Sequence, residues 1–245
     1  MSADLERLAT DLAAVRRHTA LLVEHTAVLA DLRAPSSCEG WSRAHVLAHV
    51  ARNAEAIQRL AQWAVDGAPR PMYPGGTRAR DAAIEEGAAK PGPASPGDRR
   101  PAGAFVDDLT ETAAALEPHL AALGGELAVA AVEMRGGLKV HPLVLPQLRL
   151  REVVFHHVDL DDGFTFADVE PELVRGFLDD AVGRLVTTEA APGLRLVSDE
   201  GDEWVVADGG VTVRGPQAGL LLWLARRDPS EVSAEGALPP LPRGS

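Results

Sequence analysis

Apolar residues and two threonines recur at alternating spacings of three and four along the first 31 residues. The series is Leu5, Leu8, Leu12, Val15, Thr19, Leu22, Thr26 and Leu29. This spacing is typical of the buried face of a helix in a bundle, and it predicts one helix from Ala3 to about Asp31. His18 and His25 flank this face, so we expect both to be half-exposed surface histidines.

A second helix is predicted from Ser42 to about Val65, because Ser42 is a good N-cap and an inward stripe follows it. The stripe consists of Val46, His49, Val50, Asn53, Ile57 and Leu60. His49 therefore points where a core residue would lie. Most histidines in such places are core residues with a satisfied hydrogen bond, and the spacing equally allows a pair of His45 and His49.

Two more helices complete the first part of the chain. They are expected from about Phe105 to Leu123 and from Leu143 to Asp162. Residues 67–103 are rich in Pro and Gly and too long for a plain connector, which suggests a functional loop or a partly disordered segment. The pattern of residues 126–141 fits a short helix or a strand. Four amphipathic helices with one long crossover predict a four-helix bundle over roughly the first 160 residues.

After Phe164 the pattern changes to that of a small α+β domain. We predict two helices, at 168–186 and 216–227, and three short strands, at 194–198, 204–207 and 211–214. The turn Asp208-Gly209-Gly210 joins the last two strands, and a polar, Pro-rich tail follows the second helix. The sequence thus predicts an α+β protein of two domains, residues 1–163 and 164–245.

The chain is acidic, with 36 Asp and Glu against 24 Lys and Arg and a net charge of -12. Such a charge repels phosphate backbones, so nucleic acid is not an expected partner. Cys38 is the only cysteine, which excludes an intrachain disulfide and a cluster of thiolate ligands. The N-terminus lacks the pattern of a signal peptide, and no apolar run is long enough for a membrane span. We expect a soluble cytoplasmic protein that works without a membrane and for which a monomer is plausible.

Candidate chemistry lies on the helix expected at 143–162, LVLPQLRLREVVFHHVDLDD. Glu152 and His156 stand four residues apart, so both side chains leave the same face, which Arg149 and Asp159 extend. A polar stripe on an apolar helix is either a salt-bridged, solvated edge or the lining of a site. Together with His49 it supplies two imidazoles and one carboxylate, which suit a catalytic zinc with an open position. Spacing alone leaves both interpretations open.

Three segments of the chain resemble the mycothiol-dependent maleylpyruvate isomerase family. They are CEGWSRAHVLAHVARNAEAI, MYPGGTRARDAAIEEGA and LPQLRLREVVFHHVDLDDGFTFADV, and the similarity continues through GPQAGLLLWLARR. It therefore covers nearly the whole chain. The resemblance implies a metal-binding four-helix bundle of the DinB type, followed by an α+β domain similar to sterol-carrier-protein folds. It also implies that His49, Glu152 and His156 bind the metal, and it leaves out His45 and His157.

The resemblance points to two arginines, Arg80 and Arg227, as catalytic contacts to an anion or to the thiol cofactor. Arg227 belongs to the second domain, so these roles imply a site between the domains. The chain departs from the family pattern at Gln147, where a tryptophan is usual, and at Arg226-Arg227, where a Gly-Arg pair is common. The first departure suggests an altered pocket wall and substrate, and the second leaves the choice between the two arginines open. We expect Cys38 to be structural.

The function that the resemblance implies is a zinc- and mycothiol-dependent cis–trans isomerisation. The thiol of mycothiol would add to the cis double bond of maleylpyruvate, the resulting single bond would rotate, and elimination would give fumarylpyruvate. Another divalent metal could replace zinc, because imidazole and carboxylate ligands accept several. Two alternatives stay open. One is a mycothiol S-transferase that conjugates the thiol to an electrophile for detoxification or biosynthesis, and the other is a non-enzymatic metal-binding module.

Overall fold

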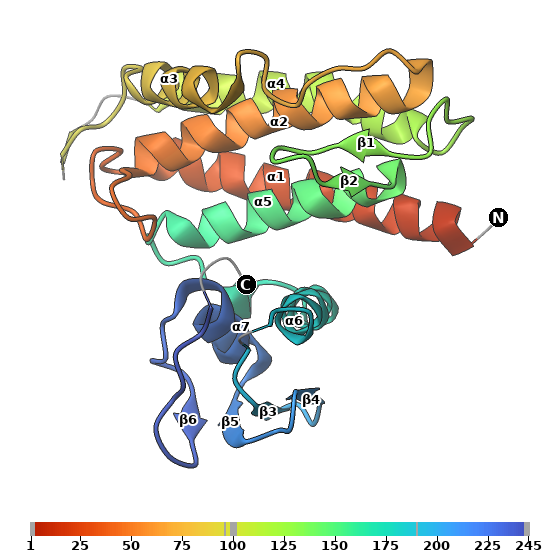
Figure 1. The fold of residues 1–245 in the computed structure, drawn as a ribbon. Coiled ribbons are helices and arrows are strands. Elements are labelled where there is room, and N and C mark those ends of the chain that lie inside the picture. Colours follow the sequence, from red (N-terminus) through yellow and green to blue (C-terminus); the bar gives the residue numbers. More distant parts are fainter. Residues whose placement is uncertain (1–2, 96, 99–101, 190, 243–245) are drawn as a thin grey trace. The chain divides into compact units, whose positions relative to one another are not determined.

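The computed structural model of the chain describes residues 3–95, 97–98, 102–189 and 191–242 (Figure 1). It divides into two compact units, Met1–Asp162 and Gly163–Ser245, beside the boundary expected from the change in pattern. The first unit is helical and the second combines helices with a sheet, so the predicted α+β class is confirmed. None of the described helices is long and apolar enough to span a membrane.

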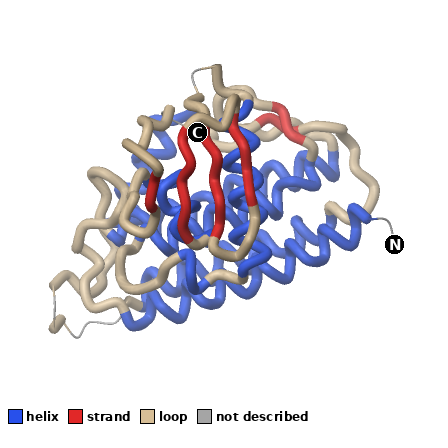
Figure 2. The backbone as a smooth tube through the Cα atoms, turned by 90° about the horizontal axis from the view of Figure 1, so that it is seen from below, coloured by secondary structure: helices blue, strands red, loops and turns tan. Residues whose placement is uncertain are grey.

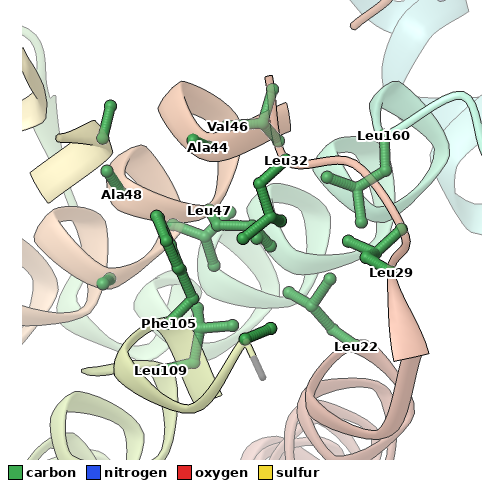
Figure 3. Close-up of a cluster of buried hydrophobic side chains, with 14 of the residues drawn as sticks. Leu22, Leu29, Leu32, Ala44, Val46, Leu47, Ala48, Phe105, Leu109 and Leu160 are labelled. Atoms are coloured by element: carbon green, nitrogen blue, oxygen red, sulfur yellow. The ribbon is translucent and has the colours of Figure 1, made fainter. Parts of the chain in front are cut away.

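Four long helices form the bundle of the first unit. They are α1 (Ala3–Val28), α2 (Arg43–Asp66), α4 (Gly103–Ala122) and α5 (Leu145–Asp159), the last preceded by the short 3-10 helix η1 (Pro142–Val144). Helices α1 and α2 each pack against both α4 and α5, which closes the ring of four. Most positions of the apolar spacing read from the sequence are buried, although Leu5, Leu12 and Thr19 of α1 are only partly buried. Figure 3 shows one cluster of this core, in which Phe105 of α4 meets Leu47 of α2 and Leu32 of the loop between α1 and α2.

Two details of α1 differ from the prediction. The helix ends at Val28 and not near Asp31. The apolar spacing in the sequence runs beyond the helix because Leu29 and Leu32, in the loop that follows, are also buried. His18 is completely buried, so its expected half exposure is wrong, whereas His25 is partly exposed. The physical reason is that α4 and α5 both pack on α1, which makes its buried face wider than a single seam.

The segment 67–103 is not simply a loop, because it contains helix α3 (Gly76–Ala88), which packs on α2. The backbone turns into α3 at Gly75 and Gly76, whose φ angles of 81° and 74° favour glycine. Near its end, a Cβ on Gly87 would lie 2.8 Å from the Cβ of Ala48. The absence of a side chain at Gly87 therefore lets α3 approach α2 closely, which positions the residues at the start of α3.

Residues 126–141 include a small antiparallel hairpin, β1 (Val132–Glu133) and β2 (Lys139–Val140). The apolar run at 127–132, for which a short helix or a strand was expected, is neither up to residue 131, and only its last residue, Val132, lies in a strand. Val132 is fully buried, and β1 packs against α2. The hairpin thus belongs to the same unit as the bundle and lies beside α2.

The second unit is built from two helices and a four-stranded sheet, whose strands lie side by side in Figure 2. Its elements are η2 (Phe166–Asp168), α6 (Pro171–Val186), β3 (Leu194–Ser198), β4 (Glu203–Val206), β5 (Val211–Gly215), α7 (Gln217–Arg226) and β6 (Ser233–Ala234). Helices α6 and α7 pack on each other and on the sheet. Strand β6 was not predicted, because it is only two residues long within a polar, Pro-rich segment.

The strand order β4-β3-β5-β6 places β3 between β4 and β5. The turn Asp208-Gly209-Gly210 is present, but it joins strands that flank β3 and does not close a hairpin. Strand β3 is antiparallel to β4 and parallel to β5. The turn crosses the start of β3 so closely that a Cβ on Gly193 would lie 1.8 Å from Asp208 Oδ1. Glycine at this position is what allows the crossing.

Candidate metal centre

Three potential metal ligands come together inside the first unit, one from α2 and two from α5. His49 Nε2 lies 3.0 Å from Glu152 Oε2, and His156 Nε2 lies 3.5 Å from the same oxygen. One donor atom of each residue lies within 4.8 Å of the others, which is close enough for a single ion to reach all three. The structure thus brings together the three residues that the sequence singled out, although they are separated by up to about a hundred positions in the chain.

Apolar neighbours hold these side chains in place. Val50 beside His49 and Val153 beside Glu152 are fully buried, so the packing of α2 on α5 leaves the adjacent polar positions facing one another. His49 itself is only 6% exposed. Glu152 and His156 therefore face His49 and line a cavity, so these two residues do not form a solvated edge.

His156 is oriented by a second carboxylate. Its Nδ1–H donates a hydrogen bond to Asp159 Oδ2 at 2.8 Å, and the Asp159 side chain is completely buried. The same oxygen accepts a hydrogen bond from the thiol of Cys38 at 3.3 Å. Metal-binding histidines commonly donate their second ring N–H to a carboxylate, which fixes the tautomer and leaves the other nitrogen for the metal. Asp159 gives His156 this arrangement, with Nε2 directed to the site.

The three candidate ligands differ in ionisation, and the Glu152 carboxylate supplies the charge that attracts a cation. Burial would raise the pKa of Glu152, but hydrogen bonds from His156 and His49 outweigh it and hold that pKa well below its ordinary value. Burial would lower the pKa of His156, but hydrogen bonds with Asp159, Cys38 and Glu152 raise that pKa well above its ordinary value. Burial is also the main reason why the pKa of His49 is lowered. The metal-free site therefore holds a carboxylate, a neutral imidazole and an imidazolium whose proton a divalent cation can replace.

Arg80 stands next to His49 because α3 packs closely on α2. Its Nη2 lies 3.2 Å from His49 Nδ1, and its Nη1 donates to Asp81 Oδ1 at 2.8 Å. The guanidinium carbon lies 5.9 Å from the ring centre of Trp41 and 5.7 Å from that of Tyr73. These two aromatic rings hold the cation by cation–π attraction. Neither ring was expected from the sequence to contact Arg80, although both lie in the segments that carried the resemblance.

These residues line one cavity of about 540 Å³. Cys38, Trp41, Tyr73 and Arg80 line it together with the three candidate ligands, as do two further arginines, Arg135 and Arg151. A volume of this size is typical of sites for small molecules. Several positive side chains beside a potential metal site suit a ligand that carries carboxylates.

The other histidines considered from the sequence make different contacts. His45 Nδ1 accepts a hydrogen bond from the backbone N–H of Ser42 at 3.2 Å, and its Nε2 lies 3.2 Å from Glu85 Oε2. His157 is 2% exposed, and its Nε2 lies 2.8 Å from Nδ1 of His25. Neither residue belongs to the group formed by His49, Glu152 and His156.

Three further residues considered from the sequence have contacts of their own. Gln147 accepts a hydrogen bond from Arg7 Nη2 at 2.7 Å and is not among the residues that line the cavity. Arg226 and Arg227 are at the end of α7 in the second unit, where Arg227 adopts a left-handed φ of 64°. Arg227 Nη2 donates to the carbonyl of Pro242 at 2.6 Å. The roles of the two arginines stay predictions.

Comparison with known proteins identifies the family. A family model described as the mycothiol maleylpyruvate isomerase N-terminal domain matches residues 12–161, which is more than half of the chain. The chain belongs to this family. No curated protein matches it significantly.

Two solved structures resemble the whole chain. One is a crystal structure of the mycothiol-dependent maleylpyruvate isomerase, with 27% sequence identity, a TM-score of 0.83 and 99% of each chain covered. The other is a crystal structure of a histidine-to-alanine mutant of that isomerase, with 26% identity, the same TM-score and the same coverage. The family match covers the helical unit that contains the candidate metal centre, and the structural similarity extends over both units. The relation to sterol-carrier-protein folds stays a prediction.

Proposed function

We propose that this family member is a divalent-metal enzyme that uses mycothiol to isomerise maleylpyruvate to fumarylpyruvate. The observation that carries the proposal is the convergence of His49, Glu152 and His156 in one cavity, on a fold that resembles the mycothiol-dependent isomerase. Two imidazoles and one carboxylate are a ligand set typical of catalytic zinc sites, which keep a coordination position for water or substrate. Asp159 supplies the outer hydrogen bond that such a site needs.

In this proposal His49 Nε2, Glu152 Oε2 and His156 Nε2 hold the metal. A bound zinc would lower the pKa of a thiol or polarise a carbonyl in its open position. Mycothiol would supply the thiol that adds reversibly to the cis double bond and is released unchanged. The protein's own residues bind the reactants, orient them and provide positive charge next to the metal.

Arg80 has a part that depends on the tautomer of His49. A guanidinium only donates, so the imidazole that accepts from Arg80 at Nδ1 carries its proton on Nε2. Metal binding through Nε2 requires the proton on Nδ1 instead, and Arg80 then loses this acceptor. We infer that metal binding makes the guanidinium available to a substrate carboxylate, which it can bind with two parallel hydrogen bonds. Arg227 remains our second proposed contact to an anion.

The proposal is tested by metal analysis and turnover of the purified protein. We expect about one equivalent of divalent metal, lost in His49→Ala, Glu152→Gln and His156→Ala. His45→Ala is the matched control, because it removes an imidazole one turn from His49 on the same helix and should keep its metal. Arg80→Ala should keep the metal and raise KM for the carboxylate substrate. Arg227→Ala should do the same, with Arg226→Ala as its neighbouring control.

Incubation of the zinc-loaded protein with mycothiol and maleylpyruvate distinguishes the possible reactions. Formation of fumarylpyruvate without net loss of thiol supports the isomerase. A stable thioether would instead support a mycothiol S-transferase, and the absence of stoichiometric metal from the purified protein would argue against both enzymes. A cytoplasmic location stays a prediction.

A further inference from the structure

A second cavity, of about 340 Å³, lies between α1 and α4 and shares none of its lining residues with the candidate metal centre. Most of its wall is apolar and includes Leu12, Val15, Val23, Ala113, Leu116 and Leu120. Two residues with buried polar atoms, Thr19 and Arg149, also line it. The combination is a mainly apolar cavity whose lining includes two residues with unsatisfied buried polar atoms.

Arg149 carries a buried positive charge that is only partly satisfied. The residue is 1% exposed, and its Nη1 donates to the carbonyl of Val50 and to Asn53 Oδ1, each at 2.8 Å. Its Nε and Nη2 are buried and have no hydrogen-bond partner within the described part of the chain. Burial lowers the pKa of Arg149 to about 10, with Glu152 acting in the opposite direction. The Glu152 carboxylate is engaged with His49 and His156 and does not form an ion pair with Arg149.

Thr19 has an unusual hydroxyl for a helix. Threonines within helices commonly donate to the carbonyl four residues earlier, as Thr10 does to Glu6 and Thr26 does to Leu22 on the same helix. The Thr19 hydroxyl is buried without any hydrogen-bond partner among the residues described. Buried polar groups are normally hydrogen-bonded, so an unsatisfied hydroxyl and two unsatisfied guanidinium nitrogens, on two residues that line one cavity, indicate a missing partner.

We infer that this cavity binds a small amphiphilic carboxylate, a monocarboxylic acid with an unbranched apolar chain. Nε and Nη2 lie on one edge of the guanidinium, which is the arrangement that binds a carboxylate through two parallel hydrogen bonds. The Thr19 hydroxyl is a third donor to the same group. The apolar wall formed by α1 and α4 then accommodates the apolar chain of the ligand, and the negative charge of its carboxylate compensates the positive charge of Arg149.

A ligand can enter the cavity past an exposed ion pair at its edge. Arg16 and Glu117, which both line the cavity, form an ion pair of 2.6 Å between α1 and α4. Their side chains are 54% and 48% exposed, and ion pairs this exposed contribute little to stability. The pair can therefore separate to admit a ligand without weakening the bundle.

Calorimetric titration of the metal-loaded, full-length protein with decanoate, below the concentration at which it forms micelles, tests this inference. We expect saturable binding of one molecule, with affinity rising about fourfold for each added methylene. Decanol and butyrate are the two control probes, since one lacks the charge and the other most of the chain. Each should bind at least about tenfold more weakly.

Two substitutions, two positions apart on α4, locate the binding. Ala113→Leu fills the cavity and should abolish decanoate binding, whereas Ala115→Leu makes the same change at an exposed position outside the cavity and should leave it intact. Thr19→Val removes only the hydroxyl and should weaken binding roughly tenfold. Equal affinity for decanol and decanoate would overturn the inference, as would equal binding by the two α4 variants. Absence of saturable binding to the wild type would show that water alone satisfies Arg149 and Thr19.

Discussion

The hydrogen bond between Asp159 and His156 provides the sharpest test of the candidate metal centre. Asp159→Asn keeps the size of the side chain but removes its charge. An amide that turns its NH2 towards His156 Nδ1 would select the tautomer with a proton on Nε2, which cannot bind metal. Loss of such outer partners typically weakens metal binding by about 10- to 100-fold, or about 1.4 to 2.8 kcal/mol. Complete burial of Asp159 and the 2.8 Å contact place this variant towards the upper end of that range.

Competition with a fluorescent zinc chelator at pH 7.5 or so measures this affinity directly. Asp162→Asn is the matched control, because Asp162 is close to Asp159 in sequence but forms its ion pair with Arg43, at 2.9 Å. We expect the control to bind zinc as tightly as the wild type. Unchanged zinc affinity in Asp159→Asn, with the fold intact by circular dichroism, would refute the role assigned to Asp159. An equal loss in both variants would mean that the effect is one of general charge.

The remaining predictions concern protons and packing. In the metal-free site His156 is protonated, Glu152 is ionised and His49 is neutral. Zinc binding at neutral pH should therefore release about one proton. Calorimetry in buffers of different ionisation enthalpy measures this release. Release of two protons would contradict this assignment. In the metal-free protein the raised pKa of His156 contributes stability below about pH 6.5, and this stability is lost as the pH rises through the raised value. Thermal melts in chelator should therefore show a melting temperature that falls at alkaline pH, and His156→Gln should remove this fall. Gly87→Ala places a Cβ 2.8 Å from α2 and should cost about 1–3 kcal/mol in chemical denaturation. It should also raise KM through the displaced Arg80 while the metal content stays unchanged, and loss of metal would show that α3 supports the ligands as well.

Much of the helical unit follows from local pattern. The spacing of Leu5, Leu8 and Leu12 predicts α1 because a helix repeats every 3.6 residues, whatever packs against it. Ser42 predicts the start of α2 for a similar reason, since an N-cap acts on its own first turn. The contact between His156 and Asp159, three residues apart on one helix, is likewise a local feature. The sequence placed Asp159 on this face but did not specify its partner.

Other features depend on residues far apart in the chain. Spacing could not show that His18 is buried, because its exposure is decided by two helices that pack on either side of α1. The order of strands in the second unit was equally hidden, since the turn at 208–210 looks the same whether it joins neighbours or crosses β3. Helix α3 was missed because glycines at both of its ends resemble loop composition, whereas in the fold they turn the chain and allow close packing.

The sequence by itself determined the four bundle helices, the α+β class and a short list of candidate ligands, because these depend on composition and on spacing within single elements. Only the tertiary structure decided that Glu152 and His156 of α5 line a cavity, since this required His49 to arrive from another helix, about a hundred residues away, and Arg80 from a third. It also decided that Arg149, which shares the stripe with Glu152, faces a different cavity. Side chains three positions apart on a helix differ by about 60° in direction, so packing alone assigns each its surroundings.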